Sequence, residues 1–238
     1  MISLDVATDR LLHRPSYLKA FLEGRSEELE LSTRDLAALD SIDKTQLVET
    51  AVAVRSSLLQ RKHRGSGGIE QCWPQTLAAW RTEHNDDKLH VFTDRFMESE
   101  IFERYREVHH MGPGLCLEEA VFRFFEVCDT GDARVREHEF LAGLCKALAM
   151  NSAPSFLVGD PLRRAPAGWF AVSMRGEPQL FAALSGRYVS GALTPFLAEL
   201  LLSEKTPDQL TADFDVDEDV VAAALGRFES LGILPPRP

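Results

Sequence analysis

The sequence has no excess of basic residues, and this lack bears on which partners it can bind. Its 238 residues contain 26 Lys and Arg against 37 Asp and Glu, giving a formal net charge of −11. Binding to nucleic acid and to anionic lipid depends largely on attraction to phosphate, which a strongly negative chain opposes. We therefore expect no nucleic-acid partner and no membrane partner.

Long apolar runs and paired cysteines are also missing. No stretch approaches the roughly 20 apolar residues of a membrane-spanning helix, and the start MISLDVATDRLLHRPSY lacks the basic and apolar regions of a signal peptide. The four cysteines, at positions 72, 116, 128 and 145, occur singly and without C-x-x-C spacing. We expect a cytoplasmic protein whose cysteines are buried reduced thiols.

Motifs for catalysis are absent or incomplete. There is no G-x-G-x-x-G, no P-loop and no G-x-S-x-G. Glu107 and His110 form one Glu-x-x-His pair, whereas a carboxylate-bridged di-iron bundle needs two such pairs and two further glutamates. The second pair fails because Val135 stands three residues before His138. A metal role for Glu107 and His110 stays open at this point.

A calcium loop is the other incomplete motif. In CDTGDARVREHEF, residues 128 to 140, Asp132 and Glu139 have the spacing of two ligands of such a loop. However, Cys128 occupies the first ligand position, and Ala133 stands where a glycine is needed. We therefore predict no catalytic residue, no bound metal and no cofactor.

Helical patterns fill the chain from residue 3 to about 149. Ser32 is a predicted N-cap in STRDLAALD, and the segment from residue 43 to 64 places apolar residues three and four apart until RGSGG ends it. Further helices are predicted at 73–83, 87–98, 99–110, 116–128 and 134–149. No repeat of 20 to 50 residues recurs, so the pattern favours a helical bundle over a solenoid.

The pattern changes after this bundle. Residues 151–169 are rich in proline and glycine and are predicted to connect two domains, with a boundary near 160. Three short β-prone runs follow, WFAVSMR, PQLFAAL and GRYVSG, and then three helices at 193–203, 207–213 and 217–231. The predicted fold class is mainly α, α+β overall. A helical bundle domain, 1–155, precedes a small winged-helix-like βββααα domain, 165–238.

The C-terminal part carries a resemblance. The strand GRYVS, the apolar helix after it, the helix start TPDQL and the close FESLGIL are similar to the winged-helix modules that recognise precursor peptides in ribosomal peptide natural-product pathways. Winged-helix transcription regulators share most of this pattern. Charge separates the two classes, because between Glu204 and Glu229 the chain has eight acidic residues and only Lys205 and Arg227 as basic ones. A helix that reads DNA needs Arg or Lys for phosphates and base edges.

A peptide-binding module of this kind would work by strand addition. In that arrangement the edge of the third strand is offered by Arg187, Tyr188 and Val189. The groove beside the third helix would be lined by Val220, Ala224 and Phe228, at spacings of four. The same stripe also fits an ordinary buried face of an amphipathic helix, and this alternative stays open. The acidic first turn of the helix would favour basic residues beside the apolar anchors of the peptide.

The N-terminal part carries a second resemblance. The helix ending FLEG, the segment LSTRDLAALD and the long helix ending LLQRKHRG are similar to bacterial accessory proteins that accompany multinuclear non-haem iron oxidases in methanobactin-type peptide pathways. This likeness covers about a quarter of the chain and brings no metal-ligand set. It implies a subunit that presents substrate to the iron enzyme.

Both resemblances lead to the same expected function. The chain is predicted to be a non-catalytic partner protein that binds the leader of a precursor peptide and presents it to a non-haem iron oxidase subunit. Two alternatives are a winged-helix transcription regulator with a helical sensor domain, and a helical-bundle metal oxygenase. The acidic C-terminal helix disfavours the first, and the incomplete ligand set disfavours the second.

Overall fold

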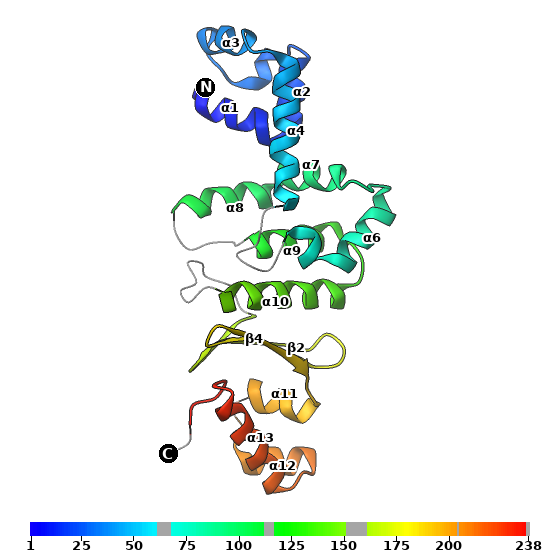
Figure 1. The fold of residues 1–238 in the computed structure, drawn as a ribbon, viewed down its shortest axis with the longest axis vertical. Helices are drawn as coiled ribbons and strands as arrows, with labels where there is room; N and C mark the ends of the chain where they lie inside the picture. Colours follow the sequence, from blue (N-terminus) through cyan, green and yellow to red (C-terminus); the bar gives the residue numbers. More distant parts are fainter. Residues whose placement is uncertain (61–67, 112–116, 151–160, 204, 237–238) are drawn as a thin grey trace.

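Layers of helices and one sheet are stacked along the long axis of the molecule (Figure 1). The computed structural model describes residues 1–60, 68–111, 117–150, 161–203 and 205–236, with only the backbone described at 58–60 and 106–111. The fold is mainly α with α+β character, as predicted. Figure 1 shows the N-terminal helices at one end, the sheet beyond α10, and the last three helices at the other end.

The first layer contains the N-terminal helices around a small core of their own. They are α1 (Leu4–His13), α2 (Pro15–Leu22), the 3-10 turn η1 (Ser26–Leu29), α3 (Thr33–Asp40) and α4 (Lys44–Gln60). Ser32 caps α3 as predicted, because its hydroxyl accepts a hydrogen bond from the Asp35 amide at 3.1 Å. Leu11, Phe21, Leu39 and Ala51 are buried together in this core.

The second layer is an aromatic-rich group of helices. It contains α5 (Ile69–Cys72), α6 (Pro74–His84), α7 (His90–Glu98), α8 (Glu100–Met111), α9 (Leu117–Cys128) and α10 (Ala133–Met150). These agree with the predicted segments with two exceptions. The short helix α5 falls where no helix was predicted, and α7 starts three residues later than predicted, after Leu89 in a left-handed conformation. Trp80, Phe92 and Phe125 pack together at its centre. No helix within the ranges described here is long and apolar enough to cross a membrane.

Cysteine burial largely follows the prediction. Cys72 and Cys145 are buried, and burial raises the pKa of the Cys145 thiol to about 12. Cys128 is only half-buried, which differs from the expected full burial, because it is the last residue of α9 and lies near Arg95. Cys116 lies outside the described residues.

Four antiparallel strands form one sheet in the order β1-β2-β3-β4. They are β1 (Arg163–Ala165), β2 (Gly168–Ser173), β3 (Gln179–Leu184) and β4 (Arg187–Ala192). The last three match the predicted runs, whereas β1 lies inside the segment predicted as a connection. Such a short run carries no alternation of its own and is a strand because it pairs with β2, Arg164 opposite Trp169. Residues 151–160 of that connection lie outside the described ranges.

Three helices complete the chain: α11 (Pro195–Leu202), α12 (Pro207–Phe214) and α13 (Glu218–Ser230). The start of α12 is a capping box in which Thr206 and Gln209 exchange hydrogen bonds, with Pro207 at the first helical position. This start was predicted from TPDQL. The end of α13 is held against the turn between β1 and β2, where the Ala167 amide donates to the Gly232 carbonyl at 3.0 Å.

The sheet is covered on both faces. Ala171, Phe181 and Ala183 belong to the same core as the aromatic layer above α10. Phe170, Leu180, Ala182 and Leu184 instead share a core with α11, α12 and α13. The division into domains 1–155 and 165–238 therefore remains a prediction, and the sheet, assigned to the second domain, shares apolar packing with the first.

Candidate functional site

A hollow of about 330 Å³ lies between β4 and α13. One wall is the main chain and small side chains from Val189 to Leu193, and the other is the face of α13 that carries Ala224 and Phe228. We call this hollow the β4–α13 groove. It is mostly apolar, and Arg227 is the cation that lines it.

Small residues on α13 keep this groove open. Val221 and Phe228 are 1% and 4% exposed and fix the helix against the core. They are seven residues apart and so lie on nearly the same side of the helix. Ala223 and Ala224 lie beside them and line the groove. Their short side chains leave space where larger ones would reach β4.

The predicted groove residues are only partly brought together. Ala224 and Phe228 line the groove. Phe228 is also part of the core, so it fits both the predicted groove and the alternative of an ordinary buried helix face. Val220 is 48% exposed and is not among the lining residues. The reason is helical phase, because Val221 takes the buried position and turns Val220 about 100° away from it. Val220 therefore belongs neither to the groove lining nor to the buried face of α13.

The strand β4 forms an edge of the sheet. Among the described residues, no further strand pairs with β4 beyond β3. The register is fixed by the two-residue turn Ser185–Gly186, whose positive φ values of 47° and 75° are those of a type I′ hairpin. Arg187 is paired with Leu184, and Val189 with Ala182.

Alternation along the ladder shows which main-chain groups of β4 are open. The Leu193 amide donates to the Pro178 carbonyl at 2.8 Å, so residue 193 faces β3. In an antiparallel pair, alternate residues then face β3 and the open edge. The main-chain groups of Val189, like those of Arg187, therefore face β3 and not the open edge. The open amides and carbonyls belong to Tyr188, Ser190 and Ala192, of which only Tyr188 is among the predicted edge residues.

The side chains of β4 also divide between two faces. Val189 packs with the core around α13, whereas Tyr188 packs on the α10 side. The Lys146 Nζ lies 5.3 Å from the centroid of the Tyr188 ring, a cation–π contact. Burial is the main cause that raises the pKa of the Tyr188 phenol, and a hydrogen bond with Ser190 lowers it in part. Tyr188 thus anchors β4 to α10, and its side chain lies away from the groove.

The start of α13 carries carboxylates that are not paired with a described cation. Lys205 is bound by Glu199 at 2.9 Å and Asp213 at 3.0 Å, and the hydrogen bond with Glu199 is the main cause that raises its pKa. Within the part of the chain that the structure describes, no cation is paired with Asp217, Glu218 or Asp219. This first turn therefore offers negative charge to whatever approaches it.

The calcium-like loop is closed by an internal cation. The buried Arg136 donates from Nη1 to the Thr130 and Gly131 carbonyls, at 2.8 Å to Gly131, and from Nη2 to Asp129 at 3.2 Å. Glu139 does not reach this loop. Its carboxylate accepts hydrogen bonds from the Gln75 amide at 2.7 Å and from Thr76, and so caps α6. These groups are structural.

Within the described residues no three His, Cys, Asp or Glu side chains lie close enough together to hold an ion. The side chains of Glu107 and His110 lie outside what the structure describes, so that pair stays a sequence-based observation.

Comparison of the chain with protein-family models, curated proteins and solved structures gives no match. The candidate site is therefore defined by its own residues and geometry.

Proposed function

We propose that this chain is a non-catalytic partner protein of the cytoplasm. It binds the leader of a ribosomally made precursor peptide and presents the peptide to a non-haem iron modifying enzyme that docks on the helical layers. The observation that supports this proposal is the coincidence of an open strand edge with an apolar groove beside it. The two resemblances described for the sequence support it as well.

Binding proceeds by addition of a peptide strand to β4. The main chain of the peptide pairs with the open groups of Tyr188, Ser190 and Ala192, which gives affinity without dependence on side chains. Because successive side chains of a strand point to opposite faces, every second peptide residue enters the β4–α13 groove. Apolar peptide side chains then pack against Ala224 and Phe228, which gives selectivity.

The two alternatives receive less support. A transcription regulator would place the start of α13 against phosphate, where Asp217, Glu218 and Asp219 carry like charge. A helical-bundle oxygenase needs a set of metal ligands, and the sequence supplies only the incomplete Glu107 and His110 pattern.

The test uses a proline on β4. Ser190→Pro removes one open amide, and the edge position tolerates proline, whereas Val189→Pro would remove a hydrogen bond to β3 and damage the hairpin. Fluorescent peptides encoded by short reading frames beside the gene are titrated into each protein. We expect Ser190→Pro to weaken binding about fivefold, the effect of about 1 kcal/mol for one hydrogen bond.

The matched control is Ser190→Ala, which removes the same hydroxyl but keeps the amide. It should bind like the natural protein. Equal affinity for Ser190→Pro and Ser190→Ala, with both folded by circular dichroism, would contradict strand addition at β4.

A further inference from the structure

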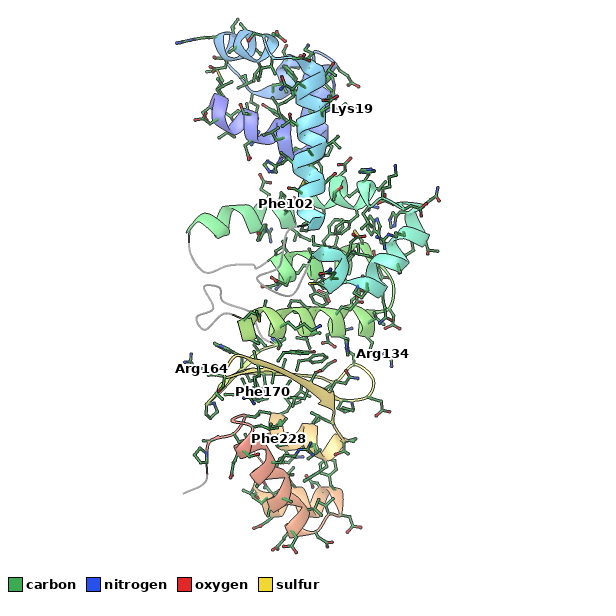
Figure 2. The ribbon with its side chains drawn as sticks, viewed as in Figure 1. Lys19, Phe102, Arg134, Arg164, Phe170 and Phe228 are labelled. Atoms are coloured by element: carbon green, nitrogen blue, oxygen red, sulfur yellow. The ribbon has the colours of Figure 1, made fainter. Side chains whose placement is uncertain are left out.

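A second hollow, of about 280 Å³, lies on the other side of the sheet from the β4–α13 groove. Three elements distant in sequence form it: the start of α6, the first two turns of α10, and the hairpin between β2 and β3. Figure 2 labels Arg134 beside this hairpin, where α10 meets the sheet, and Phe228 on the opposite side of the sheet. We call this hollow the arginine pocket, after Arg134 and Arg175.

A glycine leaves room for Arg134 beside the hairpin. Gly176 has a φ of +85°, and a Cβ added to it would lie 2.8 Å from the Cδ of Arg134. The turn therefore leaves room for the arginine stem to lie across it. No carboxylate is paired with the guanidinium of Arg134 among the residues whose side chains are described. Its five donors are available to a ligand.

The second arginine is already partly neutralised. Arg175 Nε lies 3.6 Å from Glu137 Oε2, and the same oxygen accepts a hydrogen bond of 2.5 Å from the buried Ser173 hydroxyl. Glu177 also lines the pocket and is exposed. Arg134 thus forms no ion pair with a described carboxylate. Hydrogen bonds from main-chain amides are the main cause that lowers the pKa of the Asp132 carboxyl, and longer-range attraction to Arg134 contributes to it.

The remaining polar lining can also donate hydrogen bonds. The side chains of Gln75, Gln179 and His138 line the pocket, and none makes a hydrogen bond to another described side chain. The ring of His138 stands edge-on to Phe181, with centroids 5.0 Å apart. Donors gathered around an arginine that forms no ion pair favour an anion, and the planar fork of arginine matches a carboxylate.

The arginine pocket and the β4–α13 groove adjoin through β3. Gln179 lines the arginine pocket, and its neighbour Leu180 lines the groove. Gln179 is paired with Ala192, the last residue of β4, whose main chain faces the open edge. A peptide strand added to β4 lies roughly 10 Å from β3, two strand spacings, and turns alternate side chains to each face. Side chains of acidic residues can therefore extend toward the arginine pocket.

We propose that the arginine pocket binds a carboxylate of the peptide whose apolar residues occupy the β4–α13 groove. This inference rests on the proposed function. It adds a requirement that strand addition alone does not contain: an Asp or Glu at a fixed distance from the apolar anchors, on the opposite face of the peptide strand.

The experiment selects binders from a displayed library of random 15-residue peptides. The full chain, the variant Arg134→Gln/Arg175→Gln and the groove variant Ala224→Glu are used as targets. The matched control, Arg34→Gln/Arg104→Gln, removes the same charge from exposed positions on α3 and α8. We expect the natural chain and the control to enrich alternating apolar residues together with an acidic residue at one fixed distance. The pocket variant should keep the apolar pattern and lose the acidic enrichment.

A selected peptide then gives a quantitative check. Replacing its acidic residue by the matching amide should weaken binding about fivefold, the upper range for an exposed ion pair, in the natural chain and not in the pocket variant. Acidic enrichment that is absent, or that persists in the folded pocket variant, would overturn the arginine pocket and leave the proposed function intact. The proposed function is contradicted if the natural chain enriches no apolar pattern, or enriches one that Ala224→Glu does not remove. The proposed role of the arginine pocket is then contradicted as well, because it rests on that function.

Discussion

The loop from Cys128 to Glu139 and the edge strand β4 both gather polar main-chain groups in one place, and they differ in what satisfies them. In the loop, Arg136 binds the Thr130 and Gly131 carbonyls, and Asp132 accepts the amides of Arg134 and Val135. On β4 the open edge has no partner among the described residues. Polar groups indicate a ligand only where the chain itself leaves them unpaired.

Two groups of carboxylates also differ in this way, buried ones that cap helices and exposed ones near the β4–α13 groove. Asp86 and Glu139 are buried carboxylates that cap helices, and every hydrogen bond they accept comes from the chain. Asp217, Glu218 and Asp219 are exposed at the start of α13. Substitutions at Asp86 or Glu139 should therefore change stability, whereas substitutions near the β4–α13 groove should change peptide affinity.

The largest effect is expected at Glu139. Glu139→Ala removes the acceptor for the Gln75 and Thr76 amides and for the buried Thr76 hydroxyl. Leaving these donors without a partner should lower the free energy of unfolding by about 3 kcal/mol. Urea denaturation measures this loss. Glu139→Gln keeps one acceptor oxygen and should lose less, and peptide affinity of the folded fraction should not change. A loss of affinity without a loss of stability would assign Glu139 to binding instead.

The next effect is expected in the groove. Ala224→Glu places a longer, charged side chain into an apolar wall, which should weaken peptide binding by about 2 kcal/mol, roughly 30-fold. Val220→Glu is the matched control, because it adds the same group one turn earlier on α13, at a position outside the groove lining. Titration of a fluorescent peptide compares them. Similar weakening by both would show that charge on α13 matters more than the groove.

Much of the fold could be predicted because its signals are local. Ser32 and Thr206 mark helix starts that the structure confirms, since a cap needs only residues three positions away. The strand β1 was missed because its three residues become a strand only through pairing with β2. The start of α7 was misplaced because it depends on Asp86, which accepts the Phe92 amide across six positions.

The candidate site was less predictable from the sequence. The faces of α13 are set by Val221, and the choice between Val220 and Val221 depends on where the helix meets the sheet. The open groups of β4 had a usable signal. A two-residue turn at Ser185–Gly186 makes Leu184 and Arg187 the closing pair, which assigns the open edge to residues 188, 190 and 192. The arginine pocket had no such signal, because its three walls come from segments about 35 to 100 positions apart.

A smaller effect is expected when the pH is lowered through the range of Asp86. Burial raises the pKa of this carboxyl, but hydrogen bonds from the Phe92 amide, the Trp80 indole and the Val91 and His90 amides outweigh it, so the pKa is lowered. The stabilisation is therefore complete above the unfolded value of about 3.9 and is lost as pH falls through the folded value. Asp86→Asn should cost about 1 kcal/mol at pH 7. Thermal melts should show this difference shrinking below about pH 4. A difference that stays constant to pH 3 would contradict the assignment.

The smallest effect concerns the acidic first turn of α13, where opposing contributions nearly cancel in the free protein. Asp217 and Asp219 favour the positive end of the helix dipole, and they repel each other and Glu218. Asp217→Asn/Asp219→Asn should therefore change stability by less than about 0.5 kcal/mol. A peptide with basic residues beside its apolar anchors should lose about twofold in affinity with this variant, and added salt should reduce the natural protein's advantage. Titrations at low and high salt measure both quantities. A loss of affinity that is independent of salt would mean that these carboxylates contact the peptide through hydrogen bonds, which would extend the binding surface from the groove to the start of α13.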